Sequence, residues 1–575
     1  MKVTFMLQKV LLTFWASKWV DMAKTKTNFM FNVAILVFCN LVTKVLGAVF
    51  RIPLLKILGS QGLGLYQLVF LLYAFMLVIS SSGISVALSK FVSKAISVQN
   101  YKLTKRYLKC GFFISLVVSL LCSVLFVAIS PLLAKYQGNA GLVYCYWIIF
   151  PSIIFSSLSS TLRGYFLGKN EMAVTGGMQI VGQASKLILS LIFASYFKTF
   201  GLIYSVAGAV LGVTVSELFS FLLFGVVYFS KRKDTKRFGI DAKVKKNEEI
   251  LPANSNIFKK KIFLCAGDKR NPSSKTIVWR LFKFAFFVSL QACIIPLTGA
   301  VDSAIVVPLL VRSGLNGTIA CTLFGLEDGI VSSLVNMPTV VATSIGVALV
   351  PNIKLDADNH LVGEQNVFES IKLVWLIGIA CAFAYAFFAR DIVSFLYSGG
   401  LGGKVVQEID VLENLIKINA FNIVYLSLLS LSTSILQGIG KSKIPVINLG
   451  ICAFLRLLLL CVLISVKNLN IYATALVDMV FYSLSFILNM VAIRKWANFS
   501  FGIGKIFVLP AMCCFAMCFV MKLFKISLSG LISTKIVTII MVLVGIATYF
   551  SLLAITKVLN IKKLLSSFKQ RRQSK

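Results

Sequence analysis

The segment from Phe38 to Leu55 reads FCNLVTKVLGAVFRIPLL and places two cations, Lys44 and Arg51, within an otherwise apolar run. A run of this composition is typical of a helix that crosses a membrane. A cation at the centre of such a helix costs about 2.5 to 3.5 kcal/mol on insertion scales, and it usually faces protein or a water-filled cavity. The rest of the chain therefore decides what these two cations do.

The composition of the chain indicates a polytopic membrane protein. Of its 575 residues, 58% are hydrophobic and only 14% are charged, and the mean hydropathy is +0.90. Soluble domains contain about 25% charged residues. The formal net charge of +38 comes mostly from Lys and Arg between the apolar runs, where membrane topology and anionic lipids account for it. We therefore expect membrane lipids as partners and no nucleic acid.

Apolar runs of membrane-spanning length recur from residue 29 almost to the C-terminus. We expect an all-α integral membrane protein with about fourteen transmembrane helices, because a bilayer core requires about 20 apolar residues per helix. The expected spans are 29–55, 63–95, 110–134, 140–165, 172–197, 202–229, 278–311, 320–351, 368–397, 413–438, 445–466, 471–493, 505–523 and 534–556.

The Lys and Arg residues are unevenly distributed between the two sides of this predicted topology. With a cytoplasmic N-terminus, roughly 38 of them fall inside and about 9 outside, as the positive-inside rule requires. We therefore expect a multi-pass protein of the cytoplasmic membrane with both termini in the cytoplasm. Residues 1–28 form the N-terminal tail, in which Met22 is one candidate for the native start and an interfacial amphipathic helix is the alternative.

Two pairs of similar motifs divide the chain into halves. SSGISVALSKFVS (81–93) resembles ATSIGVALVPNIK (342–354), and TLRGYFLGKNEMAV (161–174) resembles SILQGIGKSKIPV (434–446). The members of each pair have the same rank within their half, which predicts two six-helix lobes related by a parallel internal repeat. The expected parts are a first lobe at 29–229, a basic cytoplasmic linker at 230–277, a second lobe at 278–493, and two extra helices with a basic tail at 494–575.

Motifs for enzymatic or metal chemistry are incomplete. GIGKS (438–442) has Ile435 where a phosphate loop needs a glycine. Cys513, Cys514 and Cys518 lack paired CxxC spacing, and the only histidine is His360. The predicted outer loops are short and contain no pairing of a nucleophile with a base. We therefore expect neither an enzyme nor a metal site, and transport becomes the favoured role.

The first predicted helix carries a polar stripe. Asn40, Lys44, Gly47 and Arg51 are spaced so that all four lie on one helical face. Lys44 falls near mid-span, whereas Arg51 lies closer to the outer end. Two structural alternatives stay open: Arg51 extends to the outer interface, and Lys44 pairs with a buried acid such as Asp302 or Glu217.

Further polar groups lie in the other predicted helices. The span 320–351 contains Glu327, Asp328, Ser333, Asn336 and Pro338, and the proline is expected to kink or open that helix. Glu327 and Asp328 are either buried or solvated at the outer rim. The remaining ionisable groups expected in the membrane are Lys186, Glu217, Asp302, Arg456 and Asp478.

Three segments together resemble one known family. They are RIPLLKILGSQGLGLYQLVFLLYAFMLVISSSGISVALSKFVS (51–93), TLFGLEDGIVSSLVNMPTVVATSIGVALVPNI (322–353) and STSILQGIGKSKIPVINL (432–449). They are similar to the stage V sporulation protein B and lipid II flippase branch of the multidrug, oligosaccharidyl-lipid and polysaccharide flippase superfamily. The likeness covers residues 29–556.

This resemblance implies a bacterial transporter that moves undecaprenyl-diphosphate-linked saccharides, such as the peptidoglycan precursor lipid II, to the outer leaflet. It implies alternating access by two lobes, no cofactor, and a role in peptidoglycan, polysaccharide or spore envelope synthesis. Helix 1 is similar to that of lipid II flippases at TKVLG (43–47), which makes Lys44 and Arg51 the candidates for binding the diphosphate. Asn40, Lys186, Asp302, Glu327, Asp328, Ser333, Asn336 and Pro338 are candidates for lining the cavity.

Departures from the family pattern leave alternatives. Many of these flippases have an arginine where this chain has Ser333, and relatives often have a glutamate where it has Gly182. A cation-coupled multidrug antiporter of the same superfamily is the main alternative, with Asp302 and Glu327 as possible carriers of H⁺ or Na⁺. A scaffold in envelope assembly is a third possibility. Coupling to membrane potential, H⁺ or Na⁺ and a monomeric state are further expectations.

Overall fold

The structure is a computed structural model, and it describes residues 29–97, 100–244, 272–350, 353–355, 361–362, 364–397, 405–466, 469–497, 503–528, 533–556 and 558. The predicted N-terminal tail with Met22, residues 245–271 of the predicted linker, His360 and nearly all of the C-terminal tail lie outside these residues.

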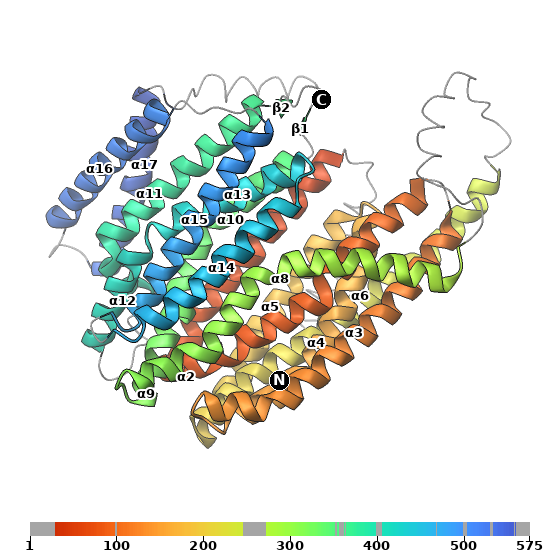
Figure 1. The fold of residues 1–575 in the computed structure, drawn as a ribbon, viewed down its shortest axis with the longest axis horizontal. Coiled ribbons are helices and arrows are strands. Elements are labelled where there is room, and N and C mark those ends of the chain that lie inside the picture. Colours follow the sequence, from red (N-terminus) through yellow and green to blue (C-terminus); the bar gives the residue numbers. More distant parts are fainter. Residues whose placement is uncertain are drawn as a thin grey trace. The chain divides into compact units, whose positions relative to one another are not determined.

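The described chain is almost entirely helical (Figure 1). The single sheet in it pairs two antiparallel two-residue strands, β1 (Lys354–Leu355) and β2 (Leu361–Val362). The helices are α2 (Phe29–Ser97), α3 (Tyr101–Tyr136), α4 (Leu142–Gly168), α5 (Met172–Phe197), η1 (Lys198–Phe200), α6 (Leu202–Val244), α8 (Ser274–Arg312), α9 (Gly317–Phe324), η3 (Gly325–Val331), α10 (Ser332–Leu349), α11 (Glu364–Tyr397), α12 (Val405–Asn419), α13 (Asn422–Gly438), α14 (Lys443–Leu463), α15 (Tyr472–Ala497), α16 (Ile503–Leu528) and α17 (Thr534–Ile555).

The predicted number of spans is confirmed once two breaks are counted. Twelve helices in the described residues are long and apolar enough to cross a membrane, and the pair α12 and α13, bent by 41°, brings the number to 13. The helix α2 contains a break at Gly59, where φ is 71°. This φ lies in the left-handed region that glycine adopts readily, so the two helices expected at 29–55 and 63–95 meet there without a loop.

Two predicted elements differ from the observed ones. The span expected at 320–351 consists of α9, the π-helical segment η3 and α10, and the span expected at 413–438 is broken between α12 and α13. The helix α6 continues to Val244, so the first part of the predicted linker extends a membrane helix. Hydropathy alone does not reveal these features because it measures composition rather than backbone hydrogen bonding.

Contacts divide the chain into two compact units. Unit 1 comprises residues 1–46 and 69–301, and unit 2 comprises residues 47–68 and 302–575. The sequence-based division into lobes at 29–229 and 278–493 is different, because the middle of α2 belongs with unit 2 and the first part of α8 with unit 1. The predicted lobe boundaries and the internal repeat stay predictions.

In unit 1, α4 packs against α3 and α6, and α5 packs against α6. Small residues permit close approach between helices: a Cβ on Gly83 would lie 2.0 Å from the carbonyl oxygen of Ala285, and one on Gly164 would lie 2.4 Å from that of Ser85. Serines add hydrogen bonds between helices, since Ser157 Oγ donates to the Ser80 carbonyl at 2.7 Å. Small residues and hydroxyls of this kind are common between helices in membranes.

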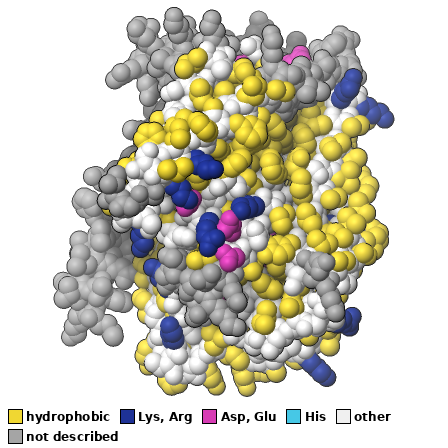
Figure 2. All heavy atoms as spheres, turned by 90° about the vertical axis from the view of Figure 1, so that its left-hand side faces the viewer, with side chains coloured by type: hydrophobic (Ala, Val, Ile, Leu, Met, Phe, Trp, Pro, Cys, Tyr) yellow, Lys and Arg dark blue, Asp and Glu magenta, His cyan; other side chains and the backbone are white. Residues whose placement is uncertain are grey.

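In unit 2, α13 packs against α10, α11 and α15, and α16 packs against α17 and α11. The pair α16 and α17 lies beside α11 at the left of Figure 1. The apolar core between these helices contains Cys513, Cys514 and Cys518, which are buried and free. Figure 2 shows hydrophobic side chains over much of the described surface on this side of the molecule, as expected for a surface in contact with lipid.

Candidate functional site

The polar stripe predicted on the first helix forms part of α2. Asn40 and Lys44 belong to unit 1 and are exposed, whereas Arg51 belongs to unit 2 and is partly buried. Cys39, next to Asn40, is fully buried, and its side chain lies 2.7 Å from the position that a Cβ on Gly176 of α5 would take. Lys44 follows Cys39 by five residues, about 140° around the helix, so it points away from this contact with α5. Within the described residues, Lys44 forms no salt bridge.

Arg51 is held by the backbone of η3. Its Nη1 donates to the carbonyl oxygen of Asp328 at 2.6 Å and also to that of Gly329. Arg51 therefore binds protein backbone, and its extension to the outer interface stays a prediction. The guanidinium donates to carbonyl groups of a π-helical turn. The same two carbonyls accept one more hydrogen bond each: Gln67 Nε2 donates to the Asp328 carbonyl at 3.0 Å, and Ser333 Oγ donates to the Gly329 carbonyl at 3.1 Å.

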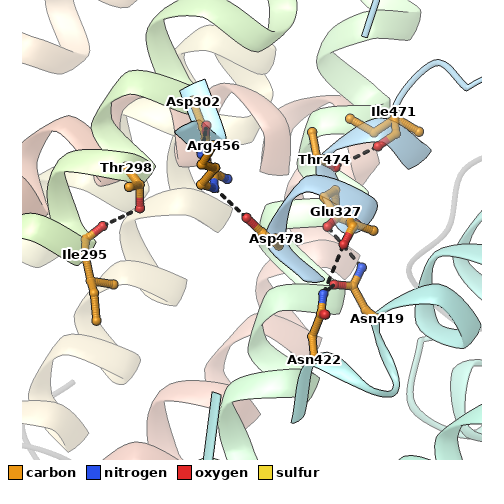
Figure 3. Close-up of polar contacts among 11 residues, drawn as sticks. Ile295, Thr298, Asp302, Glu327, Asn419, Asn422, Arg456, Ile471, Thr474 and Asp478 are labelled. Atoms are coloured by element: carbon orange, nitrogen blue, oxygen red, sulfur yellow. Dashed lines mark hydrogen bonds and ion pairs between the residues drawn. The ribbon is translucent and has the colours of Figure 1, made fainter. Parts of the chain in front are cut away.

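Glu327 begins a chain of buried polar side chains. Glu327 is only 8% exposed, so the alternative in which water solvates it at the outer rim is wrong. Glu327 Oε1 accepts a hydrogen bond from Asn419 Nδ2 at 3.2 Å, and Asn419 Oδ1 accepts one from Asn422 Nδ2 at 2.8 Å (Figure 3). Asn419 ends α12 and Asn422 begins α13. The chain therefore joins η3 to the break between these helices.

Asp302, Arg456 and Asp478 form a triad that connects three helices. Arg456 on α14 is 5% exposed; its Nη1 and Nη2 each donate at 2.7 Å to Asp302 on α8, and its Nε donates at 2.6 Å to Asp478 on α15. Figure 3 shows Arg456 between the two carboxylates. The contact with Asp302 has the bidentate geometry that guanidinium groups form with carboxylates. Asp302 thus pairs with Arg456, so it is not the predicted partner of Lys44.

Unit 1 contains a second group of charges around Glu217. This glutamate on α6 hydrogen-bonds to Ser156 and interacts electrostatically with Lys186 on α5 and Arg163 on α4. The Lys186 ammonium lies 4.5 Å from the centre of the Phe70 ring. Glu217 therefore interacts with Lys186 and Arg163. The alternative in which Glu217 pairs with Lys44 is wrong.

The polar residues predicted on α10 take up local roles. Asn336 is exposed and its Nδ2 donates to the Ser332 carbonyl at 2.7 Å. Pro338 lacks an N–H group, so the carbonyl of Leu334, four residues earlier, has no partner within the helix. Tyr385 on α11 donates its hydroxyl to this carbonyl at 3.3 Å. The helix α10 continues through Pro338, so the predicted kink or opening stays a prediction; the carbonyl that the proline leaves free accepts a hydrogen bond from protein.

Sequence reasoning did not single out four residues that complete these networks: Gln67, Arg163, Asn419 and Asn422. A signal for two of them was present, because Asn419 and Asn422 are amides inside a predicted membrane span, where polar side chains are costly and usually face a protein interior. Arg163 lies within the repeated motif at 161–174, and Gln67 lies within the segment 51–93 that carries the family resemblance. In the described part of the chain, no group of acidic, cysteine or histidine side chains is arranged to hold a metal ion.

The formal charges of these residues differ in sign between the two units. Lys44, Arg163 and Lys186 exceed Glu217 by two positive charges in unit 1. Asp302, Glu327, Asp328 and Asp478 exceed Arg51 and Arg456 by two negative charges in unit 2. Among these residues, the excess charge is therefore positive in unit 1 and negative in unit 2.

Comparison with known proteins identifies relatives over most of the chain. Lipid II flippase MurJ of Bacillus subtilis (strain 168) is 25% identical over 479 residues, which are 80% of this chain and 82% of MurJ. Stage V sporulation protein B of the same organism is 25% identical over 392 residues, which are 66% of this chain and 68% of that protein. The resemblance predicted from the sequence is thereby confirmed.

Solved structures have the same fold. A structure of lipid II flippase MurJ in an inward closed conformation matches with a TM-score of 0.64 at 14% identity, covering 91% of this chain and 98% of MurJ. An inward-facing multidrug resistance MATE family transporter of the MOP superfamily matches with a TM-score of 0.57 at 14% identity, covering 82% of this chain and all of that protein. Residues 29–355, more than half of the chain, match the model of a family described as polysaccharide biosynthesis protein. The chain therefore belongs to the polysaccharide biosynthesis protein family of multi-pass membrane proteins.

Proposed function

We propose that this protein is a flippase that moves an undecaprenyl-diphosphate-linked saccharide, lipid II or a related precursor, from the inner to the outer leaflet. The observation that carries the proposal is the similarity to lipid II flippase MurJ over 80% of the chain. The cargo supplies envelope synthesis, and movement follows alternating access of the two lobes. The protein works as a monomer with both termini in the cytoplasm.

Three features of Lys44 support a role for this residue in binding the diphosphate. The side chain is exposed on α2, it has no salt bridge in the described residues, and it belongs to unit 1, where Lys44, Arg163 and Lys186 outnumber Glu217. A diphosphate needs donors that are not already paired with carboxylates. A charge-assisted hydrogen bond contributes about 1.5 to 3 kcal/mol, which corresponds to about 10- to 150-fold in affinity. Arg51 is a weaker candidate, because Nη1 is already bonded to η3 and only its other N–H groups remain for cargo.

The cation-coupled drug antiporter is less well supported. Such a transporter needs a carboxylate that can bind the drug or its counter-ion, and Asp302 was one of two candidates. Its two oxygens accept hydrogen bonds from Arg456. The similarity to MATE transporters is one of fold at 14% identity and does not extend to cargo.

Rescue of a bacterial strain depleted of its lipid II flippase tests the proposal. The wild-type chain is expected to restore growth, whereas Lys44→Ala is expected to reach the membrane in normal amount without restoring it. Lys56→Ala is the matched control, because Lys56 is an exposed lysine on the same helix that forms no salt bridge in the described residues. Failure of the wild-type chain to restore growth, at a membrane level equal to that of an active flippase, would refute the proposal.

A further inference from the structure

The buried carboxyl of Glu327 lies in an unusual stretch of backbone. The segment η3 is π-helical, and single π-helical turns inside membrane helices frequently mark functional sites. It packs tightly against unit 2's part of α2: a Cβ on Gly325 would lie 2.5 Å from the backbone nitrogen of Gly64. The backbone next to Glu327 is therefore closely packed against α2.

The two oxygens of the carboxyl differ in their surroundings. Oε1 accepts the hydrogen bond from Asn419, whereas Oε2 is buried and has no hydrogen-bond partner in the described structure. Asn422, at the other end of this series of hydrogen bonds, also has a buried Oδ1 that accepts no hydrogen bond in the described structure. An ionised carboxylate only accepts hydrogen bonds, so burying Oε2 without a donor costs free energy. A proton on Oε2 removes the charge and supplies a donor to this network.

The charges around Glu327 are mostly negative. Asp328 of η3, Asp302 of α8 and Asp478 of α15 all interact electrostatically with it. The surrounding elements also contribute Arg456, Tyr482, Arg51 and Tyr66. Both arginines are already engaged, Arg456 by two carboxylates and Arg51 by backbone carbonyls. On α12, Glu408 accepts a hydrogen bond from Ser60 instead.

We propose that Glu327 is a proton-binding site, and that its protonation controls the contact between η3 and the break between α12 and α13. Glu327 Oε2 forms an O–H bond with a proton from a hydronium ion, which leaves as water, and the carboxyl becomes neutral; on release the same O–H bond breaks and the proton returns to water. A metal ion does not fit as well, since it needs several oxygen ligands and the guanidinium of Arg456 already occupies the carboxylates of Asp302 and Asp478.

Protonation changes the strength of one hydrogen bond at the bend between α12 and α13. The bond from Asn419 to an ionised carboxylate is charge-assisted, and it becomes an ordinary bond when Glu327 is neutral. Asn419 lies at the 41° bend between α12 and α13. Proton uptake therefore loosens the link between η3 and this bend. That this step drives cargo movement rests on the proposed flippase function, whereas proton binding itself does not.

Infrared difference spectroscopy of the purified protein between alkaline and near-neutral pH, a range in which exposed carboxyls stay ionised, tests the site without cargo. The wild-type protein is expected to show the C=O band of a protonated carboxyl that titrates, and Glu327→Gln should lose it. Glu413→Gln is the matched control, because Glu413 is a carboxyl on α12 that pairs with Lys417. Asn419→Ala keeps the carboxyl and removes its donor, so it should shift the pH at which the band appears. A titrating band that survives unchanged in Glu327→Gln and Asn419→Ala would overturn the proposal, as would its absence from wild type.

Transport of fluorescent lipid II in proteoliposomes tests the coupling. One proton coupled to one cargo molecule changes the distribution between leaflets by at most about tenfold per unit of pH gradient. We expect the wild-type protein and Glu413→Gln to respond to the gradient and Glu327→Gln to lose the response. A gradient response retained by Glu327→Gln would refute the proton site while leaving the flippase. A titrating band without any lipid II movement would refute the flippase while leaving the proton site.

Discussion

Replacing Arg456 by methionine tests the triad most directly. The change removes three charge-assisted hydrogen bonds of 2.6 to 2.7 Å and leaves Asp302 and Asp478 without their counter-ion. Removing one partner of a buried ion pair costs about 3 to 5 kcal/mol. The side chains of Asp302 and Asp478 are 16% and 21% exposed, so water can partly solvate the two carboxylates once Arg456 is removed. We therefore expect the lower end of the range, a loss of about 3 kcal/mol in the free energy of unfolding.

Denaturant titration in mild detergent, followed by tryptophan fluorescence, measures this loss. Arg390→Met is the matched control, because the Arg390 side chain is 58% exposed and its carboxylate partners lie at 3.3 and 3.4 Å. Exposed pairs contribute about 0 to 1 kcal/mol. Adding Asp302→Asn and Asp478→Asn to Arg456→Met should recover most of the loss, since no buried charge then lacks a partner. Equal losses for Arg456→Met and Arg390→Met, or no recovery in the triple variant, would refute this reasoning.

Four further predictions concern other parts of the molecule. Lys44→Arg keeps the cation and should still rescue growth in the complementation assay, whereas a loss equal to that of Lys44→Ala would argue against phosphate binding. Gly64→Ala should destabilise the protein by about 1 to 3 kcal/mol in the same denaturant titration, because the new Cβ would lie 2.0 Å from the Cys321 carbonyl oxygen. Tyr385→Phe leaves the Leu334 carbonyl without its donor and should cost about 1 kcal/mol. In intact cells of a variant without native cysteines, a cysteine placed in 231–244 should resist a membrane-impermeant thiol reagent, and labelling from outside would overturn the predicted orientation.

The sequence predicted individual helices well and their interruptions poorly. The bounds expected for one span, 172–197, are those of α5, because a run of apolar residues between polar ends fixes a membrane helix locally. The π-helical turn around Glu327 and the bend after Asn419 were not predicted. Both depend on which backbone groups find partners in neighbouring helices, such as the contact of Arg51 with the carbonyls of Asp328 and Gly329.

The sequence by itself determined the class of protein, the number of spans and the family, because hydropathy, charge bias and motifs are properties of short segments. It also indicated most of the residues that carry charge within the predicted spans, although Arg163 was missed. Only the tertiary structure decided their partners, since these lie far apart in the chain: Arg456 is 154 residues from Asp302, and Arg51 is 277 residues from Asp328. A charge within a membrane helix needs a partner or a water-filled cavity, and the packing of distant helices decides which of these it meets. Local sequence patterns do not contain that information.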